Sequence, residues 1–250
     1  MNSSRLAVLA LLFSSLSGSS FAAEEAFKLE EGFVSLFNGT NLSGWGYRAR
    51  AARGAAPARS AEDFAGKTAS SDGRFTAADG IITVHVFVPP TAASSNAPVV
   101  TPPAANPSAV PPGTASGNAA PPPAPGGRGA GGGGRPPGQI TGIWTQQTFP
   151  KDFILRLEFR ASVNADSGIF IRQTQLQCRD YLVAGPYTEL KKYKPQDWNE
   201  IEVVVTGSVA RCTCNGELLE AALAVPATGS IGLEGDWGSM EYRRIRIKEL

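Results

Sequence analysis

Alternating apolar and polar positions are the clearest signal in this chain, and they predict β-strands. Every second residue of 153–160 is a large apolar one, and the residues between them are Ile, Arg, Glu and Arg. Residues 201–206 alternate in the same way. Because successive side chains of a strand point to opposite faces, each segment is expected to bury one face. No stretch has the pattern of a long amphipathic helix, so the chain is predicted to be all-β, an antiparallel sandwich.

A hairpin is predicted where residues 209–214 run into Asn215-Gly216 and residues 217–220 return. The Asn-Gly pair is typical of a two-residue type I′ turn. In the last predicted strand the apolar residues break strict parity, which indicates a bulge near Arg243-Arg244. The first and last strands are expected to lie close together. Further strands are predicted at residues 32–37, 80–88, 142–146, 167–172, 175–181, 229–233 and 240–248.

Composition changes abruptly at residue 89. Residues 89–139 contain 14 of the 19 prolines and 10 glycines, with almost no large apolar residue. Such a segment buries too little surface to offset its ordering entropy, so a long disordered insertion is predicted. It is either a Pro-rich ligand for a partner or a permissive loop, and its drifting Ala/Pro/Gly mixture favours the loop. The insertion is expected to enter and leave between two neighbouring strands.

The first 22 residues have the pattern of an export signal. Arg5 precedes an apolar segment at 6–16, and Ser20-Phe21-Ala22 forms a small-x-small cleavage site. The alternative is an N-terminal anchor that stays in the membrane. We expect an exported protein, periplasmic or secreted, that has no membrane segment after cleavage. Residues 23–250 are then a single β-sandwich domain interrupted at 89–139, and 177 residues outside the insertion suffice for one core.

Charge and residue counts exclude several kinds of site. The net charge is +1, which argues against nucleic-acid binding through a broad basic surface. The single histidine, His85, excludes a multi-His metal site and is expected to be structural rather than a catalytic base. Cys212 and Cys214 lie two residues apart on a predicted strand, about 6.6 Å, too far apart and too parallel for a relaxed disulfide. Either one of them bonds Cys178, or all three are buried reduced thiols.

Four blocks of sequence follow one another in a recognisable order and spacing. They are residues 31–39 with 42–45, 153–160 with 166–172, 197–199 with 214–216, and 231–233 with 240–250. This order resembles the 3-keto-disaccharide hydrolase family, also described as 3-keto-glucoside lyase/hydratase. The resemblance implies a jelly-roll sandwich of the concanavalin A-like lectin/glucanase type, found mostly in exported bacterial proteins.

The resemblance also implies a chemistry, the cleavage of 3-keto-glycosides by elimination and hydration. Such a site needs a base near C2, a cation near the C3 oxygen and a proton donor for the leaving group. The cation is either an Arg or a divalent metal ion, the cofactor that the family implies. A carbohydrate or 3-keto-glycoside is therefore the expected partner, and the sequence does not determine the oligomeric state.

Three residues are predicted to be catalytic, namely Arg172, Asp180 and Glu234. Arg172 is expected on the sheet face opposite Ile169 and Ile171, where it would clamp an enolate oxygen; a surface ion pair is the alternative. Asp180 matches the family's Asp and would be a base or metal ligand. Both are expected to face one concave surface, with Glu234 near them. Asp166 is expected to be a turn residue.

Residues 175–181 place polar side chains on one face, which is typical of a sugar-binding surface or of a solvent-facing edge strand. Gln175 stands where the family carries a Glu, and an amide cannot accept a proton. The loop at 234–238 is expected either to rim the site or to form a simple hairpin turn, while Trp198 is expected to pack. The predicted substrate-binding residues are Gln175, Gln177, Arg179, Glu189, Asp236 and Trp237.

The sequence leaves two main functions open. The favoured function is an exported enzyme acting on 3-keto-glycosides. The alternative is a carbohydrate-binding module that keeps the same sandwich without catalysis, which Gln175 and the single histidine favour. An interaction protein that acts through its Pro-rich insertion is a third hypothesis.

Overall fold

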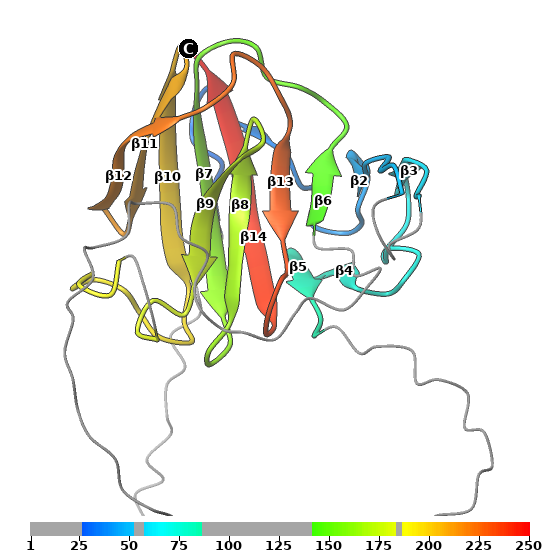
Figure 1. Cartoon of the computed structure of the whole chain (residues 1–250), viewed down its shortest axis with the longest axis horizontal. Coiled ribbons are helices and arrows are strands. Elements are labelled where there is room, and N and C mark those ends of the chain that lie inside the picture. Colours follow the sequence, from blue (N-terminus) through cyan, green and yellow to red (C-terminus); the bar gives the residue numbers. More distant parts are fainter. Residues whose placement is uncertain (1–26, 53–57, 87–141, 184–186) are drawn as a thin grey trace, which may run out of the picture.

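The computed structural model describes residues 27–52, 58–86, 142–183 and 187–250, and every regular element in them is a β-strand. The strands form two antiparallel sheets, and Figure 1 shows these as two layers, with β8 (Asp166–Ile171), β9 (Thr174–Arg179) and β13 (Ile231–Glu234) in front of the larger sheet. The predicted all-β antiparallel sandwich is therefore confirmed. The export segment 1–22 and the insertion 89–139 lie outside the described residues.

The larger sheet has eight strands. They are β1 (Val34–Ser35), β4 (Phe75–Ala78), β5 (Ile81–Val84), β7 (Phe153–Ala161), β10 (Asn199–Thr206), β11 (Val209–Cys214), β12 (Glu217–Ala224) and β14 (Met240–Glu249). Their order is β12-β11-β10-β7-β14-β5-β4, and β1 pairs with the second half of β14. The predicted proximity of the first and last strands is thus confirmed.

The smaller sheet has six strands in the order β3-β2-β6-β13-β8-β9. Besides β8, β9 and β13, it contains β2 (Trp45–Tyr47), β3 (Glu62–Asp63) and β6 (Gly142–Thr145). β5 and β6, which flank the insertion, belong to different sheets. The expectation that the insertion lies between neighbouring strands is therefore wrong, because this connection crosses from one sheet to the other.

The core lies between the two sheets. In β7 buried and half-buried residues alternate along the whole strand, with Leu155, Leu157 and Phe159 fully buried. Ile169 and Ile171 from β8 belong to the same apolar cluster. Apolar burial of this kind contributes about 25 cal/mol per Å² and is the main force that holds the sheets together.

The hairpin and the bulge are both confirmed. Asn215 and Gly216 have φ angles of 48° and 80°, as a type I′ turn requires. The pairing of β14 with β7 shifts register between Arg243 and Arg246, and Arg244 has a φ of 52°. The predicted strands at 32–37 and 80–88 shorten to β1 and β5, whereas β2, β3 and β4 are too short to show a pattern in the sequence.

The three cysteines are free and buried. Cys178 lies on β9, and Cys212 and Cys214 lie on β11. Burial raises the pKa of Cys212 and of Cys214 to about 12 and also raises that of Cys178. The sequence left open a disulfide to Cys178 or three buried reduced thiols, and the structure has the three reduced thiols.

Arg172 does not face the sheet surface, and this prediction is wrong. It follows β8 in the turn to β9, where its φ of 47° breaks the strand's alternation. Its side chain is 0% exposed. The guanidinium donates hydrogen bonds to backbone carbonyl oxygens of three segments: Phe149 at 2.7 Å, Lys151 at 2.5 Å, Gly207 at 2.8 Å and Pro226 at 3.2 Å. Arg172 therefore ties loops together at one end of the sandwich.

Replacing Arg172 should reduce stability. Arg172→Ala would leave four carbonyl oxygens without their donor, and an unsatisfied buried acceptor costs about 1–3 kcal/mol. We expect the free energy of unfolding to fall by about 3 kcal/mol or more, measured by urea unfolding, while the exposed Arg211→Ala changes it little. If Arg172→Ala lost turnover while its free energy of unfolding stayed unchanged, Arg172 would have a catalytic role instead.

Ion pairs cover the outer face of the larger sheet. Glu30 precedes β1, and both of its carboxylate oxygens accept 2.7 Å hydrogen bonds from Arg246 of β14. Arg156 of β7 contacts the same carboxylate at 3.3 Å. The hydrogen bond from Arg246 is the largest cause that lowers the pKa of Glu30 to about 2. The N-terminal segment is thereby attached to the sheet.

This pairing predicts a pH dependence of stability. Because the folded pKa lies below the ordinary value of 4.5, the unfolded chain binds the proton more tightly. The contribution of Glu30 is thus complete above pH 4.5 and is lost as the pH falls through about 2. Glu30→Gln should flatten the decrease of Tm in this range. The same flattening in the control Glu31→Gln, a change at the exposed neighbour, would contradict this assignment.

Candidate functional site

The outward face of the smaller sheet carries a continuous set of polar and aromatic side chains. Ile169, Leu176 and Leu233 are fully buried in the core. Since strand residues alternate, the residues next to them point away from the core. These outward residues are Trp144 of β6, Glu234 of β13, Asp166 and Phe170 of β8, and Gln175, Gln177 and Arg179 of β9.

The strand register places Glu234 near the middle of this face. Glu234 is paired with Gly142 of β6. On its other side, the pairing of Leu233 with Ile169 brings Glu234 alongside Gly168, which pairs in turn with Gln177. A carboxylate therefore lies between two glycines on the central strands of the sheet.

Gly168 allows Gln175 to reach Glu234. A Cβ at position 168 would lie 2.9 Å from Cγ of Gln175 and 2.8 Å from its Nε2. Without that atom, the Gln175 side chain crosses β8, and its amide donates a hydrogen bond to Oε2 of Glu234. Gly232 has a similar role, since a Cβ there would lie 2.7 Å from the Trp144 ring. The indole therefore lies against the sheet.

Glu234 is held firmly. Its residue is only 5% exposed. Its backbone oxygen accepts hydrogen bonds from Oγ of Ser167 at 2.6 Å and from the hydroxyl of Tyr242 at 2.9 Å. The end of β13 is thus attached to β8 and to the core, and the carboxylate is in a fixed position.

Arg179 and Asp166 form a second charged group on this face. Nη2 of Arg179 lies 3.4 Å from Oδ2 of Asp166, and Nη1 donates to Oε1 of Gln177 at 3.4 Å. Nε of Arg179 is buried and has no hydrogen-bond partner among the described residues. Burial raises the pKa of Asp166, and the nearby Asp236 carboxylate adds to this, while Arg179 acts in the opposite direction. Asp166 is therefore a paired strand residue of this cluster rather than a turn residue.

Asp236 and Trp237 lie on the loop after β13, as expected for the rim of a site. Backbone hydrogen bonds in both directions, at 2.9 and 2.8 Å, join Asp166 to Trp237. The Trp237 side chain is nevertheless 66% exposed. An aromatic surface in this position is accessible to a ligand.

Asp180 does not belong to this face, and its predicted proximity to Arg172 is wrong. Arg172 precedes β9 and Asp180 follows it, so the two residues lie at opposite ends of a strand that is about 20 Å long. Asp180 is 3% exposed, and its carboxylate accepts hydrogen bonds from the Asn164 backbone at 3.1 Å, the Gln196 amide at 3.2 Å and the Tyr193 hydroxyl at 3.3 Å. These neutral donors join loops, so Asp180 has a structural role.

Tyr181 departs from the predicted polar face for the same reason. β9 ends at Arg179, and Tyr181 turns into the core, where its ring contacts those of Phe159 and Tyr193. The alternation of residues 175–181 therefore holds only as far as Arg179.

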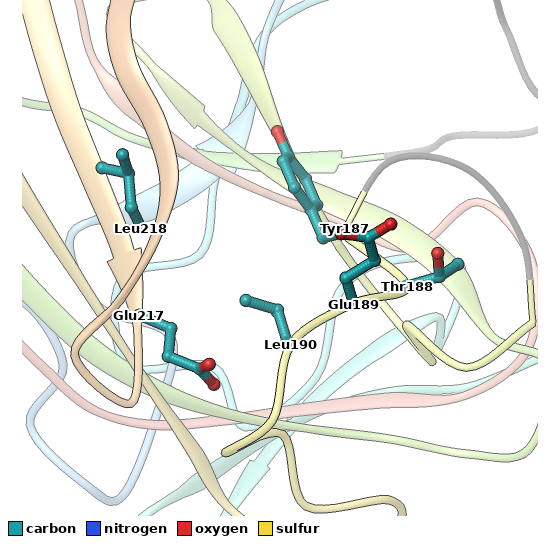
Figure 2. A pocket seen from close by; sticks show the side chains of 6 residues that line it. All are labelled: Tyr187, Thr188, Glu189, Leu190, Glu217 and Leu218. Carbon is teal, nitrogen blue, oxygen red and sulfur yellow. The ribbon is translucent and has the colours of Figure 1, made fainter.

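Glu189 lies in a separate cavity of about 580 Å³ at the edge of the larger sheet. Figure 2 shows its lining residues, Tyr187, Thr188, Glu189 and Leu190 on the loop and Glu217 and Leu218 on β12. The Glu217 carboxylate accepts backbone hydrogen bonds from Lys191 and Lys192, which lower its pKa. Since β12 belongs to the larger sheet, this cavity is distinct from the Glu234 face.

The described residues do not fit a metal centre. Among them, no three His, Cys, Asp or Glu side chains are grouped closely enough to hold an ion. We therefore derive no step through the divalent metal that the family resemblance implies. In the same part of the chain, no helix is long and apolar enough to cross a membrane.

Sequence reasoning missed two outward-facing residues, Trp144 and Arg48. Trp144 carried a usable signal, because it alternates with Ile143 in the predicted strand at 142–146. Arg48 carried none, because β2 has only three residues. The guanidinium carbon of Arg48 lies 3.6 Å from the centroid of the Trp144 ring.

Parts of this chain are similar to known proteins in sequence and in fold. Residues 126–248 match the family described as the 3-keto-alpha-glucoside-1,2-lyase-like domain. The crystal structure of a "putative glycosyl hydrolase" from Parabacteroides distasonis is similar with a TM-score of 0.51 at 13% identity, over 89% of this chain and 98% of that one. The carbohydrate-binding module CBM66 from Bacillus subtilis has a TM-score of 0.32 at 8% identity, over 43% of this chain and 81% of that one. No curated protein sequence matches the chain.

The first structural likeness shows the fold, and the family match covers the strands that carry Glu234, Asp166, Gln175 and Arg179. The resemblance seen in the sequence is therefore confirmed for residues 126–248, which match the model of the 3-keto-alpha-glucoside-1,2-lyase-like domain.

Proposed function

We propose that this protein cleaves 3-keto-glycosides by elimination and hydration on the outward face of the smaller sheet. The observation that carries the proposal is the Glu234 carboxylate, which is 5% exposed, lies between glycines and accepts a hydrogen bond from an amide. The family match supports the class of substrate.

The reaction needs a base before anything else. A ketone at C3 acidifies the proton on C2, so that a carboxylate can remove it. The electron pair of the C2–H bond forms a C1=C2 double bond, and the glycosidic oxygen leaves C1 and takes up a proton. Water then adds across the double bond, with hydroxyl at C1 and hydrogen at C2. The net result is hydrolysis.

Glu234 is the proposed base. The Gln175 amide orients it, and an amide donor favours the charged form of the carboxylate. A second carboxylate at position 175 would repel Glu234 and raise the pKa of one of the two groups. Gln175, which stands where the family carries a Glu, is therefore compatible with Glu234 as the single base.

Asp166 is the proposed proton donor, and Arg179 the proposed binder of sugar oxygens. Burial raises the pKa of Asp166, which favours the protonated form that a general acid needs. Arg179 lies in the same cluster, with Nη2 3.4 Å from Oδ2 of Asp166. The exposed Trp237 would border the bound sugar.

Export belongs to this proposal. The sequence pattern of residues 1–22 supports a periplasmic or secreted enzyme, which would meet its glycosides outside the cytoplasm.

Glu234→Gln should lower kcat on a methyl 3-keto-glucoside by about a hundredfold or more, because general base catalysis contributes about 10²–10⁴-fold. Product formation and unfolding by urea are measured together, and stability should change little. The matched control is Glu189→Gln in the separate cavity, which should retain full activity. Loss of activity in Glu189→Gln with full activity in Glu234→Gln would instead place the active site in that cavity. Binding of the sugar without turnover in the parent protein would instead identify a carbohydrate-binding module.

Asp166→Asn should lower the turnover of a substrate by an amount that depends on its leaving group. A methoxide leaving group needs a proton, so turnover of the methyl glycoside should fall by about a hundredfold. Nitrophenolate leaves without a proton, so the nitrophenyl 3-keto-glucoside should lose little. Equal losses for both substrates would show that Asp166 is not the acid.

A further inference from the structure

Arg48 is stacked on an aromatic pair beside the proposed site. Its guanidinium carbon lies 3.6 Å from the centroid of the Trp144 ring. The ring centroids of Trp144 and Phe170 are 4.7 Å apart, and their planes form an angle of 32°. The indole lies against the sheet, because Gly232 has no Cβ atom that would collide with it. Arg48 is thus held on a rigid surface formed by β6, β13 and β8.

The register brings Arg48 into line with Glu234. Gly46 of β2 pairs with Trp144 of β6, so Arg48, two residues further on, comes alongside Gly142. Gly142 is the pairing partner of Glu234. The Cα atoms of Arg48 and Glu234 are therefore about 10 Å apart, two strand spacings, and only a glycine separates them.

The Arg48 guanidinium has no carboxylate within ion-pair distance among the described residues. Two arginines stacked on Trp198, on the outer face of the larger sheet, provide the contrast. Arg160 also pairs with Glu241, and Arg243 with Glu158, at 2.5 and 2.6 Å. Those arginines serve ion pairs of the surface, whereas Arg48 keeps its charge available to a ligand.

Stacking leaves the donors of a guanidinium available. The five N–H groups lie in the plane of the guanidinium and point away from its centre, so a ring against one face does not block them. Partial burial lowers the pKa of Arg48, which shows that the cation is already partly desolvated. Such a group binds an oxyanion more strongly than a fully hydrated one does.

We propose that Arg48 binds the C3 oxygen of the substrate and stabilises the negative charge that this oxygen gains when C2 loses its proton. Trp144 positions Arg48, and the Phe170 ring borders the sugar. This inference rests on the proposed function, and it adds the cation that the elimination needs, a role for which Arg172 was predicted from the sequence.

The test compares Arg48→Gln with Arg160→Gln, its counterpart on Trp198. Turnover is measured on a methyl 3-keto-glucoside, and binding of this sugar and of methyl glucoside is measured by calorimetry. Arg48→Gln should lower kcat/KM by about a hundredfold or more, the scale for losing one electrostatic donor, and should weaken binding of the keto sugar more than that of its parent. Arg48→Lys should recover part of the loss, and Trp144→Leu should reproduce part of it. Arg160→Gln should match the parent protein.

The binding measurement separates this inference from the proposed function. If the parent protein prefers the keto sugar but does not turn it over, and Arg48→Gln removes that preference, the contact between Arg48 and the C3 oxygen holds and the elimination proposal fails. The inference is overturned if Arg48→Gln keeps parental kcat/KM, if it weakens both sugars equally, or if the parent protein does not distinguish the two sugars.

Discussion

Packing between the two sheets determines where the site lies. The core requires Ile169, Leu176 and Leu233 to point inwards, and each of these residues forces its neighbours on β8, β9 and β13 to point outwards. A shift of one residue in any of these strands would exchange the two sets. The apolar interior thus fixes the carboxylate and amide groups of the opposite face.

Two glycines convert this face into a possible site. On an ordinary sheet, side chains project outwards from the sheet, and side chains of non-adjacent strands do not meet. At Gly168 and Gly232 the missing Cβ atoms let Gln175 cross a strand to Glu234 and let Trp144 lie against the sheet. A buried, oriented carboxylate and a flat aromatic surface then occupy adjacent strands. Polar groups fixed in this way need little reorganisation when charge develops nearby.

The sequence predicted what alternation can determine and failed where alternation stops. It assigned the sandwich, the Asn215-Gly216 hairpin and the common face of Gln175, Gln177 and Arg179. Arg172 and Asp180 were misplaced because both follow strand ends, where a turn and not the pleat sets the direction of the side chain. Arg48 lies beside a strand of three residues, too short for any periodic signal.

Nuclear magnetic resonance can test directly whether a sugar binds the outward face of the smaller sheet. The ¹⁵N-labelled protein would be titrated with a methyl 3-keto-glucoside, and the backbone amide shifts would be followed residue by residue. We expect the largest shifts at Gly168, Gly232, Gln175 and Gln177. Shifts confined to residues 187–190 and 217–218, which line the separate cavity, would contradict this expectation.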